Sequence, residues 1–431
     1  MVDYLFLKLN KFVPEKWKWV LDHDGFKKYF KNTGWMFFGQ MFSLIASFFI
    51  STWLARYLGP KNYGIISYSI AFVGMFNFIA YLGIHSILSR DLVRYPEKKD
   101  ELLGTSFFLL LTSSFVAFVF VVVSVFLFES SVFIRSLIIL YASNFLWSAL
   151  GVINIFFQST VQAKKNVSVG IISCVAASIL KIVLIITGKG IIWLILIFVF
   201  ETLLNSMLYI LIYKKSGFKF SAWRFNLKLA KDILSGAWLL SFAAAASFIL
   251  VRVDQVMIRH FLGEVSVGLY AVALKLVEIW YFIPGIICTS FLPAIINAKK
   301  TSEEKYFSRL NKLYVLLSGI AVIIAIPLTI FASWLTNFLF GNAYIEAAGV
   351  LKIYVWSGVG LFLNVGFYQY FLLENRLKLI FYFYLFLMII NVVLNLILIP
   401  KLGLTGAAWA TLISYSIGPI IVFGIKKFFN K

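Results

Sequence analysis

Long uninterrupted apolar segments are the feature of this sequence that most limits its possible folds. A helix needs about 20 mainly apolar residues to cross the ~30 Å hydrocarbon core of a bilayer. Only 13% of the residues are charged and 61% are hydrophobic, whereas a soluble domain has about 25% charged residues. Twelve windows meet the length requirement: 34–56, 63–85, 103–128, 132–158, 167–188, 190–213, 235–258, 265–297, 312–334, 347–372, 378–400 and 404–425. We therefore predict an all-α integral membrane protein with twelve transmembrane helices.

The Lys and Arg residues are distributed very unequally over the connections between these windows. Of 39 in total, 29 lie on one set of alternating connections, which includes the N-terminal segment, the basic stretch 214–233 and the C-terminal tail, and 6 lie on the other. Because positive charge is retained on the cytoplasmic side, both termini are predicted to be cytoplasmic. The net charge of +21 then reports topology and attraction to anionic lipids, and we expect no nucleic-acid partner.

Residues 1–33 alternate bulky apolar and basic side chains, as in FLKLNKFVPEKWKWVLD. This pattern is typical of an amphipathic segment lying in the cytoplasmic interface of the membrane. A solvated tail is the alternative interpretation.

An internal repeat divides the chain. RYLGPKNYGI (Arg56–Ile65) and HFLGEVSVGL (His260–Leu269) share the order basic, aromatic, Leu, Gly, four variable residues, Gly, aliphatic. Gly59 thus pairs with Gly263, and Gly64 with Gly268. An even number of spans per half gives both halves the same orientation, as in transporters built from parallel repeats. The predicted organisation is an interfacial segment 1–33, a six-helix bundle 34–213, a basic cytoplasmic linker 214–233, a second six-helix bundle 234–425 and a cytoplasmic tail 426–431.

Charged residues inside the windows are candidates for function. A charge near the bilayer centre costs about 2.5–3.5 kcal/mol on insertion scales, so it faces a cavity or a partner. Lys181 and Glu201 lie in consecutive windows and are predicted to reach each other. Arg252 and Asp254 point roughly 200° apart on an ideal helix, so they cannot both face one cavity unless the helix unwinds. A purely structural role, or snorkelling in the case of Arg252, is the alternative.

Basic residues outnumber acids within the spans and at their ends, which predicts a cavity suited to an anionic headgroup such as a pyrophosphate. The candidate substrate-binding residues are Arg252, Lys181, Lys275, Arg56, Lys352 and Gln255. The candidate ion-coupling residues are Asp254, Glu201 and Glu278. Lys275 and Glu278, three residues apart on one helix face, have mutual neutralisation as their alternative role. Asn391 and Asn395, one turn apart, are expected to join helices.

Enzyme chemistry is not indicated by the sequence. It contains no Gly-x-x-x-x-Gly-Lys-Ser/Thr phosphate loop, no nucleophile elbow and no zinc motif. The external connections, of at most about fifteen residues, are too short for a catalytic domain. We predict a protein that is not an enzyme, with no metal or cofactor apart from Na⁺ or H⁺ as a coupling ion.

Several segments resemble polysaccharide flippases, the O-antigen and capsule exporters of the multidrug/oligosaccharidyl-lipid/polysaccharide superfamily. They are WLARYLGPKNYGIISYSIAF, SFILVRVDQVMIRHFLGEVSVGLYAVALKLVEIWYFIPGIICTSFLPAI, LFGNAYIEAAGVLKIY and INVVLNLILIPKLGLTGAAWATLISY. The resemblance runs from about Trp35 to Phe423. It implies two six-helix bundles that form a V around a central cavity, and it places Arg252 and Asp254 where the family carries an Arg/Asp pair on its seventh helix. Twelve spans, in place of fourteen, argue against the branch that flips peptidoglycan precursors.

The resemblance also implies a function. The expected substrate is an undecaprenyl pyrophosphate that carries a short oligosaccharide. The protein would move it from the cytoplasmic to the periplasmic leaflet of a bacterial inner membrane by alternating access, driven by an ion gradient. Membrane lipids and a polysaccharide polymerase are the expected partners, and a monomer the expected state. The alternatives are a multidrug/cation antiporter of the same superfamily, which would favour an acidic cavity, and a membrane glycosyltransferase or polymerase, which would need a large external loop.

Overall fold

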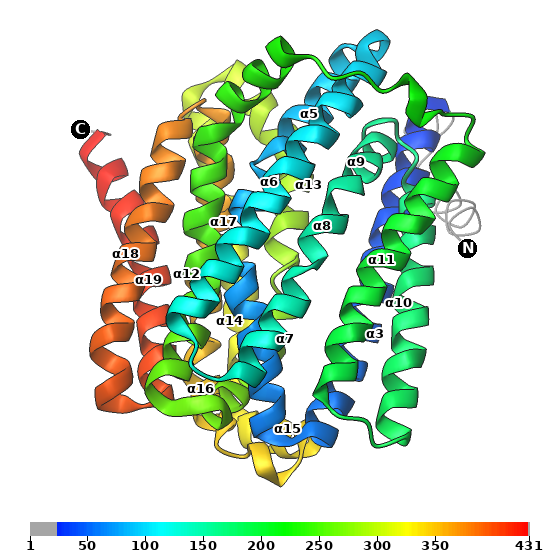
Figure 1. The fold of residues 1–431 in the computed structure, drawn as a ribbon. Helices are drawn as coiled ribbons and strands as arrows, with labels where there is room; N and C mark the ends of the chain where they lie inside the picture. Colours follow the sequence, from blue (N-terminus) through cyan, green and yellow to red (C-terminus); the bar gives the residue numbers. More distant parts are fainter. Residues whose placement is uncertain (1–23, 430–431) are drawn as a thin grey trace, which may run out of the picture. The chain divides into compact units, whose positions relative to one another are not determined.

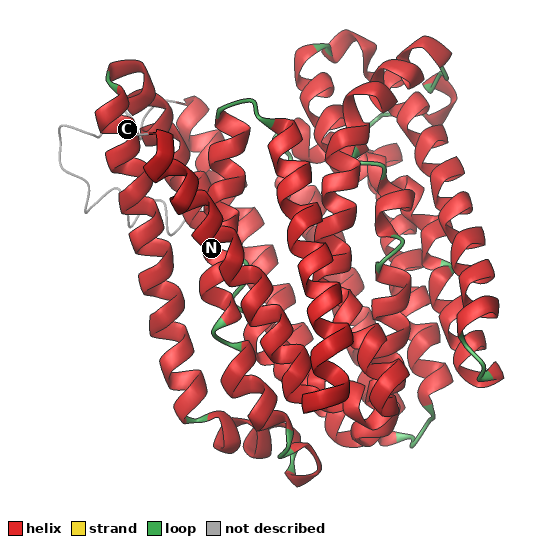
Figure 2. Cartoon of the chain, turned by 90° about the vertical axis from the view of Figure 1, so that its left-hand side faces the viewer, coloured by secondary structure: helices red, strands yellow, loops and turns green. Residues whose placement is uncertain are grey.

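The computed structural model describes residues 24–429, and every regular element in that part of the chain is a helix (Figure 1 and Figure 2). The first half comprises α3 (Asp24–Gly74), α4 (Asn77–Tyr81), α5 (Ile84–Arg94), η1 (Pro96–Lys98), α6 (Lys99–Phe128), α7 (Val132–Ala142), α8 (Asn144–Ser148), η2 (Ala149–Gly151), α9 (Val152–Ser159), α10 (Ala163–Ile186) and α11 (Ile191–Lys215). The second comprises η3 (Phe220–Ala222), α12 (Leu227–Glu278), α13 (Ile283–Thr301), α14 (Glu303–Ile330), α15 (Ala332–Phe340), η4 (Asn342–Tyr344), α16 (Ala347–Tyr354), α17 (Ser357–Leu373), α18 (Leu377–Leu402) and α19 (Leu404–Phe429). Most of the predicted interfacial segment, residues 1–23, lies outside the described residues.

Nine helical segments within residues 24–429 are long and apolar enough to cross a membrane, or ten if the bent pair α16 and α17 makes one crossing. The number is smaller than the predicted twelve because Lys31–Gly74 and Ser241–Thr301 are each counted as one segment. Each of these segments covers, completely or in large part, two of the predicted windows. The chain is therefore a multi-pass helical membrane protein. Its division into twelve spans stays a prediction.

Helices α3 and α12 are far longer than one crossing and break at equivalent glycines. The 51 residues of α3 would measure about 77 Å if straight, more than twice the ~30 Å core. Gly59 (φ 70°, ψ 170°) interrupts α3, and Gly263 (φ 82°, ψ −178°) interrupts α12. Glycine adopts positive φ without the steric cost that other residues meet, so these two residues allow the breaks. They are the pair that the repeat aligned.

The other two repeat glycines allow close packing of backbones. A Cβ atom on Gly64 would lie 1.9 Å from the carbonyl oxygen of Glu264, and one on Gly268 would lie 2.0 Å from that of Pro60. Pro60 and Glu264 are themselves equivalent positions, each directly after the break. The segment after Gly59 therefore packs against the segment after Gly263 in a reciprocal contact that only glycine permits.

The chain divides into two compact units. Unit 1 consists of residues up to Ile50 and Ile79–Trp238, and unit 2 of Ser51–Phe78 and the chain from Leu239 onward. Residues 51–78, predicted within the first bundle 34–213, thus belong to unit 2, because the reciprocal glycine contact ties them to α12. The predicted linker 214–233 belongs to unit 1. The grouping into two six-helix bundles stays a prediction.

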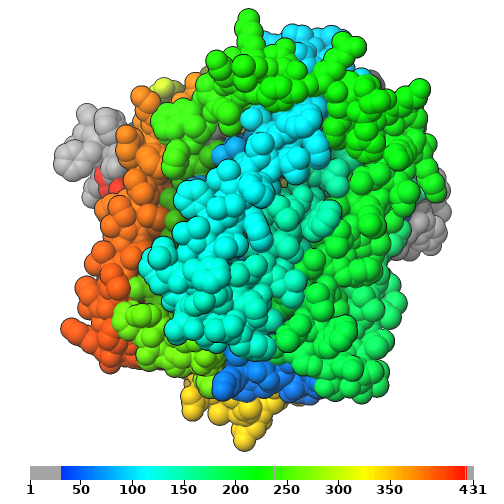
Figure 3. Space-filling view, in the orientation of Figure 1, coloured from blue at the N-terminus to red at the C-terminus, as the bar shows by residue number. Residues whose placement is uncertain are grey.

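Unit 1 has an apolar core under α5, α6, α9 and α11, in which Leu88, Leu103, Phe157 and Tyr213 are among the fully buried side chains. Its helices α10 and α11 run side by side (Figure 1). Large apolar side chains also cover the outside of α6, where Phe115, Phe120 and Leu127 are more than half exposed. The region that contains α6 is drawn in cyan on the face that Figure 3 shows. An apolar exterior of this kind suits contact with lipid.

Unit 2 is held together by an apolar core between α13, α14 and α17 and by a polar contact between α18 and α19. Asn391 and Asn395 are fully buried. The Asn391 amide donates to Ser414 Oγ at 3.1 Å, and the Asn395 amide donates to Asn391 Oδ1 at 3.0 Å. The prediction that these asparagines join helices is confirmed for Asn391, whereas Asn395 bonds to Asn391 within α18.

Candidate functional site

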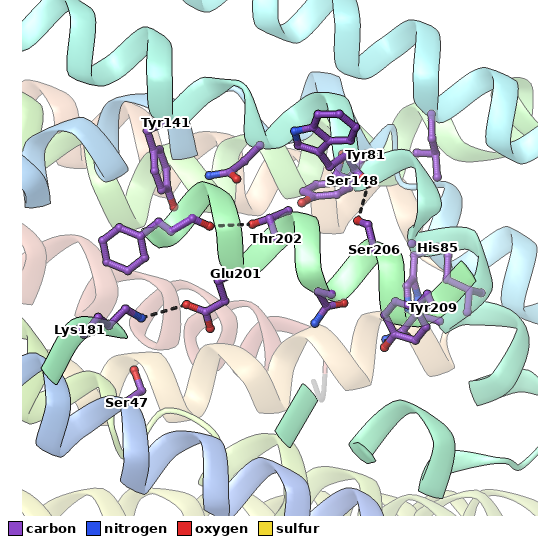
Figure 4. Close-up of a pocket in the computed structure, with 18 residues that line it drawn as sticks. Ser47, Tyr81, His85, Tyr141, Ser148, Lys181, Glu201, Thr202, Ser206 and Tyr209 are labelled. Atoms are coloured by element: carbon purple, nitrogen blue, oxygen red, sulfur yellow. Dashed lines mark hydrogen bonds and ion pairs between the residues drawn. The ribbon is translucent and has the colours of Figure 1, made fainter. Parts of the chain in front are cut away.

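A cavity of about 710 Å³ lies within unit 1. Its volume falls in the range of roughly 300–1,000 Å³ that is usual for small-molecule sites. Although the surrounding helices are strongly apolar, most of the lining side chains are polar or aromatic (Figure 4). The hydroxyl and amide side chains are Ser47, Asn144, Ser148, Asn154, Thr202, Asn205 and Ser206. The aromatic side chains are Tyr81, Tyr141, Trp147, Phe198 and Tyr209.

Lys181 of α10 and Glu201 of α11 form an ion pair in the cavity wall (Figure 4). Lys181 Nζ lies 2.9 Å from Glu201 Oε2 and 4.7 Å from the centre of the Phe198 ring. The side chains are 12% and 32% exposed. The predicted pair is thus confirmed as a contact. Among the described residues Glu201 Oε1 has no hydrogen-bond donor, so one oxygen remains available to a ligand.

Away from this pair, the cavity wall contains amides and hydroxyls (Figure 4). The Asn154 amide donates to Tyr209 Oη at 2.5 Å, and the Ser206 hydroxyl donates to the Trp147 carbonyl at 3.1 Å. Asn144 Oδ1 is buried, yet within the described part of the chain it accepts no hydrogen bond. The sequence predicted no role for Asn144, Asn154, Asn205, Trp147 or Tyr209. A signal for this site was nevertheless present, because three amides, Asn144, Asn154 and Asn205, stand within otherwise apolar windows.

The stretch VRVDQ of α12, Val251–Gln255, lies before the break at Gly263, and its charged side chains contact residues after the break. Arg252 donates to both carboxylate oxygens of Glu278, at 3.0 and 3.4 Å. Asp254 is 1% exposed and accepts from Tyr270 Oη at 2.5 Å and from the Gln255 backbone N–H at 2.7 Å. The two arms of α12 therefore fold back on each other and are held together by these contacts.

Arg252 and Asp254 point to different partners, as the predicted angle of about 200° requires, and the helix does not unwind between them. The geometry gives both residues a role inside the fold. Their predicted roles in substrate binding and ion coupling, and that of Glu278, stay predictions.

The other candidate residues are dispersed over unit 2. Gln255 is buried and Lys275 is half-buried on α12, while Arg56 on α3 and Lys352 on α16 are exposed. The Arg56 guanidinium donates to the Phe338 carbonyl. None of these four side chains lines the unit 1 cavity, and their predicted role in substrate binding stays a prediction.

Metal binding is not indicated either. Within residues 24–429 no group of three or more His, Cys, Asp or Glu side chains is placed to hold a metal ion.

Comparisons with known proteins add the family and the fold. Residues 29–299 match the family of polysaccharide biosynthesis proteins. A Shigella flexneri protein assigned as an O-antigen transporter is 24% identical over 368 residues, which cover 78% of this chain and 81% of the relative.

Among solved structures, the fold is similar to that of a multidrug resistance transporter of the MATE family in its inward-facing conformation, with a TM-score of 0.70 and 16% identity over 90% of this chain and 94% of the other. It is also similar to the lipid II flippase MurJ in an inward closed conformation, with a TM-score of 0.69 and 18% identity over 90% of this chain and 87% of the other. Both matches extend over most of each chain, so they describe the whole fold.

The match over residues 29–299 covers more than half of the chain, and the structural likenesses agree with the resemblance seen in the sequence. The chain therefore belongs to the polysaccharide biosynthesis protein family and has the fold of the transporters and flippases of the multidrug/oligosaccharidyl-lipid/polysaccharide superfamily.

Proposed function

We propose that this protein is a flippase for a lipid-linked oligosaccharide. It moves an undecaprenyl-pyrophosphate-linked oligosaccharide from the cytoplasmic to the outer leaflet of a bacterial cytoplasmic membrane, by alternating access. Family membership and the relative assigned to O-antigen transport support this substrate class. A polymerase that joins exported units is the expected consumer of the product.

The observation that carries the proposal is the polar cavity with an ammonium group inside an apolar helical unit. A polar group without a hydrogen-bond partner in the membrane costs free energy. A cavity lined by such groups therefore indicates a polar occupant. The headgroup enters the cavity while the lipid tail remains in the bilayer. Lys181 replaces part of the hydration that the pyrophosphate loses, through charge-assisted hydrogen bonds.

The proposed coupling to an ion gradient acts through the pairing of Lys181. The Glu201 carboxylate and a pyrophosphate compete for the same ammonium group, which Glu201 now holds at 2.9 Å. A proton on Glu201, or a Na⁺ ion that binds its carboxylate, weakens the pair and frees Lys181 for the substrate. Ion binding and substrate binding are then linked through one side chain, and the linkage is reciprocal.

The multidrug/cation antiporter is the second candidate, because a MATE transporter shares the fold. An organic cation needs an available carboxylate. The negative charge of Glu201 is already balanced by Lys181, although Glu201 Oε1 accepts no hydrogen bond among the described residues, and both oxygens of Asp254 accept protein hydrogen bonds. These contacts favour an anionic substrate. A glycosyltransferase or polymerase is disfavoured because the predicted external connections between α6 and α7, residues 129–131, and between α10 and α11, residues 187–190, are too short for a catalytic loop.

The first experiment measures export. Lys181→Ala and Arg252→Ala should abolish surface polysaccharide, leave the protein in the membrane and cause lipid-linked units to accumulate on the cytoplasmic side. Lys378→Ala changes an exposed lysine in the first turn of α18; it is the matched control and should export normally. Normal export by both variants would remove Lys181 and Arg252 from the proposed mechanism.

The second experiment measures coupling in vesicles with an imposed proton or sodium gradient. Glu201→Gln and Asp254→Asn should blunt the gradient dependence of transport, because neither amide binds a proton or a cation as a carboxylate does. If both variants respond to the gradient as the parent protein does, these acids are not the coupling groups.

A further inference from the structure

The cavity of unit 1 has polar capacity that the Lys181–Glu201 pair does not use. Asn144, Asn154 and Asn205 come from α8, α9 and α11, yet all three line this one cavity. An amide in a membrane helix normally finds a partner within the protein. Three amides around a cavity therefore indicate a ligand with many hydrogen-bonding groups.

The hydrogen-bond pattern shows which of these groups are available. Ser148 and Ser206 donate to backbone carbonyls, at 2.7 and 3.1 Å, so their protons are already used. Asn144 Oδ1 is buried without a donor in the described part of the chain. The side chain of Asn205 makes no hydrogen bond to another residue among 24–429, although it lines the cavity. Leaving the buried Asn144 Oδ1 unpaired costs about 1–3 kcal/mol, which a hydrogen bond from a ligand would recover, and the half-buried Asn205 amide can exchange water for the same ligand.

The side chains that line the unit 1 cavity suit a sugar better than a second phosphate or a hydrophobic drug. An amide offers two donors and an acceptor, which matches the donor and acceptor character of adjacent hydroxyls on a sugar ring. Trp147 and Tyr209 add flat apolar surfaces for the C–H faces of such a ring. A second phosphate would need more cations, whereas among residues 24–429 Lys181 is the only Lys or Arg in the wall and is already paired. A hydrophobic drug would leave the amides unpaired.

We propose that Asn144, Asn154 and Asn205, with Trp147 and Tyr209, form a subsite for neutral sugar rings, next to Lys181, which holds the phosphate-bearing end once Glu201 releases it. This inference rests on the proposed flippase function and assigns the sugar portion of its substrate to unit 1. Asn144 and Asn205 supply the specific contacts, and the Asn154–Tyr209 hydrogen bond keeps the wall in place.

The test compares two lipids on the full-length protein in nanodiscs by native mass spectrometry. One lipid is the undecaprenyl-pyrophosphate-linked oligosaccharide extracted from source cells that lack this protein, and the other is undecaprenyl pyrophosphate without sugar. The parent protein should bind the sugar-bearing lipid at least about tenfold more tightly, since each tenfold is 1.4 kcal/mol and two or more hydrogen bonds contribute.

The Asn144→Ala/Asn205→Ala variant should bind both lipids about equally, while its affinity for the sugar-free lipid is unchanged, which also shows that it is folded. Lys181→Ala should weaken the binding of both lipids and retain the preference for the sugar-bearing lipid. Asn337→Ala, an exposed asparagine on α15, is the matched control and should behave as the parent.

Two results separate the sugar subsite from the flippase proposal. If the parent protein binds both lipids equally, or the double alanine variant retains the preference, the subsite is wrong and the flippase proposal stands. If the parent protein binds neither lipid, the flippase proposal fails and the subsite fails with it.

Discussion

Two ion pairs within the spans have nearly the same separation, 2.9 Å for Lys181–Glu201 and 3.0 Å for Arg252–Glu278, but different surroundings. Arg252 takes both oxygens of Glu278 across the break of α12. Lys181 takes one oxygen of Glu201 beside a cavity of about 710 Å³. A pair whose acceptors are all used within the fold holds a helix hairpin together, whereas a pair with an acceptor left over beside a cavity is available to a ligand.

The internal repeat shows which first-half residues are equivalent to those that make the contacts across the break of α12. The first-half positions equivalent to Arg252, Asp254, Tyr270 and Glu278 are Phe48, Ile50, Ile66 and Gly74, all apolar. The glycine breaks are common to both halves, but the four positions that make polar contacts across the break in the second half are occupied by apolar residues in the first. Four experiments would break or sharpen the comparison.

The largest effect on stability is expected at Asp254. Asp254→Ala leaves the Tyr270 hydroxyl without its acceptor in a fully buried place and should lower the free energy of unfolding by about 3 kcal/mol. Thermal unfolding of the detergent-purified protein measures this. Asp254→Asn keeps an acceptor for the Tyr270 hydroxyl, so it should lower the free energy of unfolding by less than Asp254→Ala does. An unchanged stability in the alanine variant would show that the contacts across the break do not hold the hairpin.

Arg252→Ala should lower the free energy of unfolding by about 2 kcal/mol, somewhat less than Asp254→Ala. The Arg252 side chain is one-third exposed, so water can hydrate the Glu278 carboxylate that remains. The double variant Arg252→Ala/Glu278→Ala should be more stable than the sum of the single changes implies, by roughly 1 kcal/mol. Strict additivity in this double-mutant cycle would mean that the pair does not couple the two arms.

Lys181→Ala should change the free energy of unfolding by less than about 1 kcal/mol, since Glu201 is 32% exposed in the cavity and remains hydrated. The same variant is expected to lose export. The two measurements together distinguish a ligand-binding pair from a structural one. A loss of stability as large as that of Asp254→Ala would make the Lys181–Glu201 pair a second structural clamp.

The smallest effect concerns Glu374, between α17 and α18 and outside the spans. Burial raises the pKa of its carboxyl, but hydrogen bonds from Lys299 and Tyr306 outweigh burial and hold the pKa below its usual range. Because the folded pKa is depressed, the contribution to stability is present above the unfolded pKa of about 4.3 and is lost as the pH falls through the folded value.

Lys299 is 44% exposed, so this contribution should remain below about 1 kcal/mol. Unfolding of the parent protein and of Glu374→Gln between pH 7 and pH 3 measures it. The two proteins should differ near neutral pH and converge in acid. A difference that grows as the pH falls would reverse the assigned sign.

Pairs that depend on local spacing were accessible from the sequence. Lys181 and Glu201 lie in consecutive windows joined by a short turn, so their contact follows from helix geometry. Asn391 and Asn395 lie one turn apart on one helix. The glycine breaks could be located because both repeats carry the same pattern. In each case the relevant distance along the chain is short or is repeated.

Contacts between distant segments were not accessible. The pairing of Arg252 with Glu278 spans 26 residues and depends on how sharply α12 folds at Gly263. The assignment of residues 51–78 to unit 2 depends on the close approach of two glycine backbones. The cavity amides looked like isolated polar residues because they come from three different helices.

The sequence by itself determined that this protein is a helical membrane protein with an internal repeat, since apolar length and the placement of charge follow from the bilayer, which acts on every segment separately. Only the tertiary structure decided which buried polar groups satisfy one another and which remain available at the cavity of unit 1. Hydrogen bonds and ion pairs require atoms within about 3 Å, and for helices far apart in the chain that proximity is created by packing.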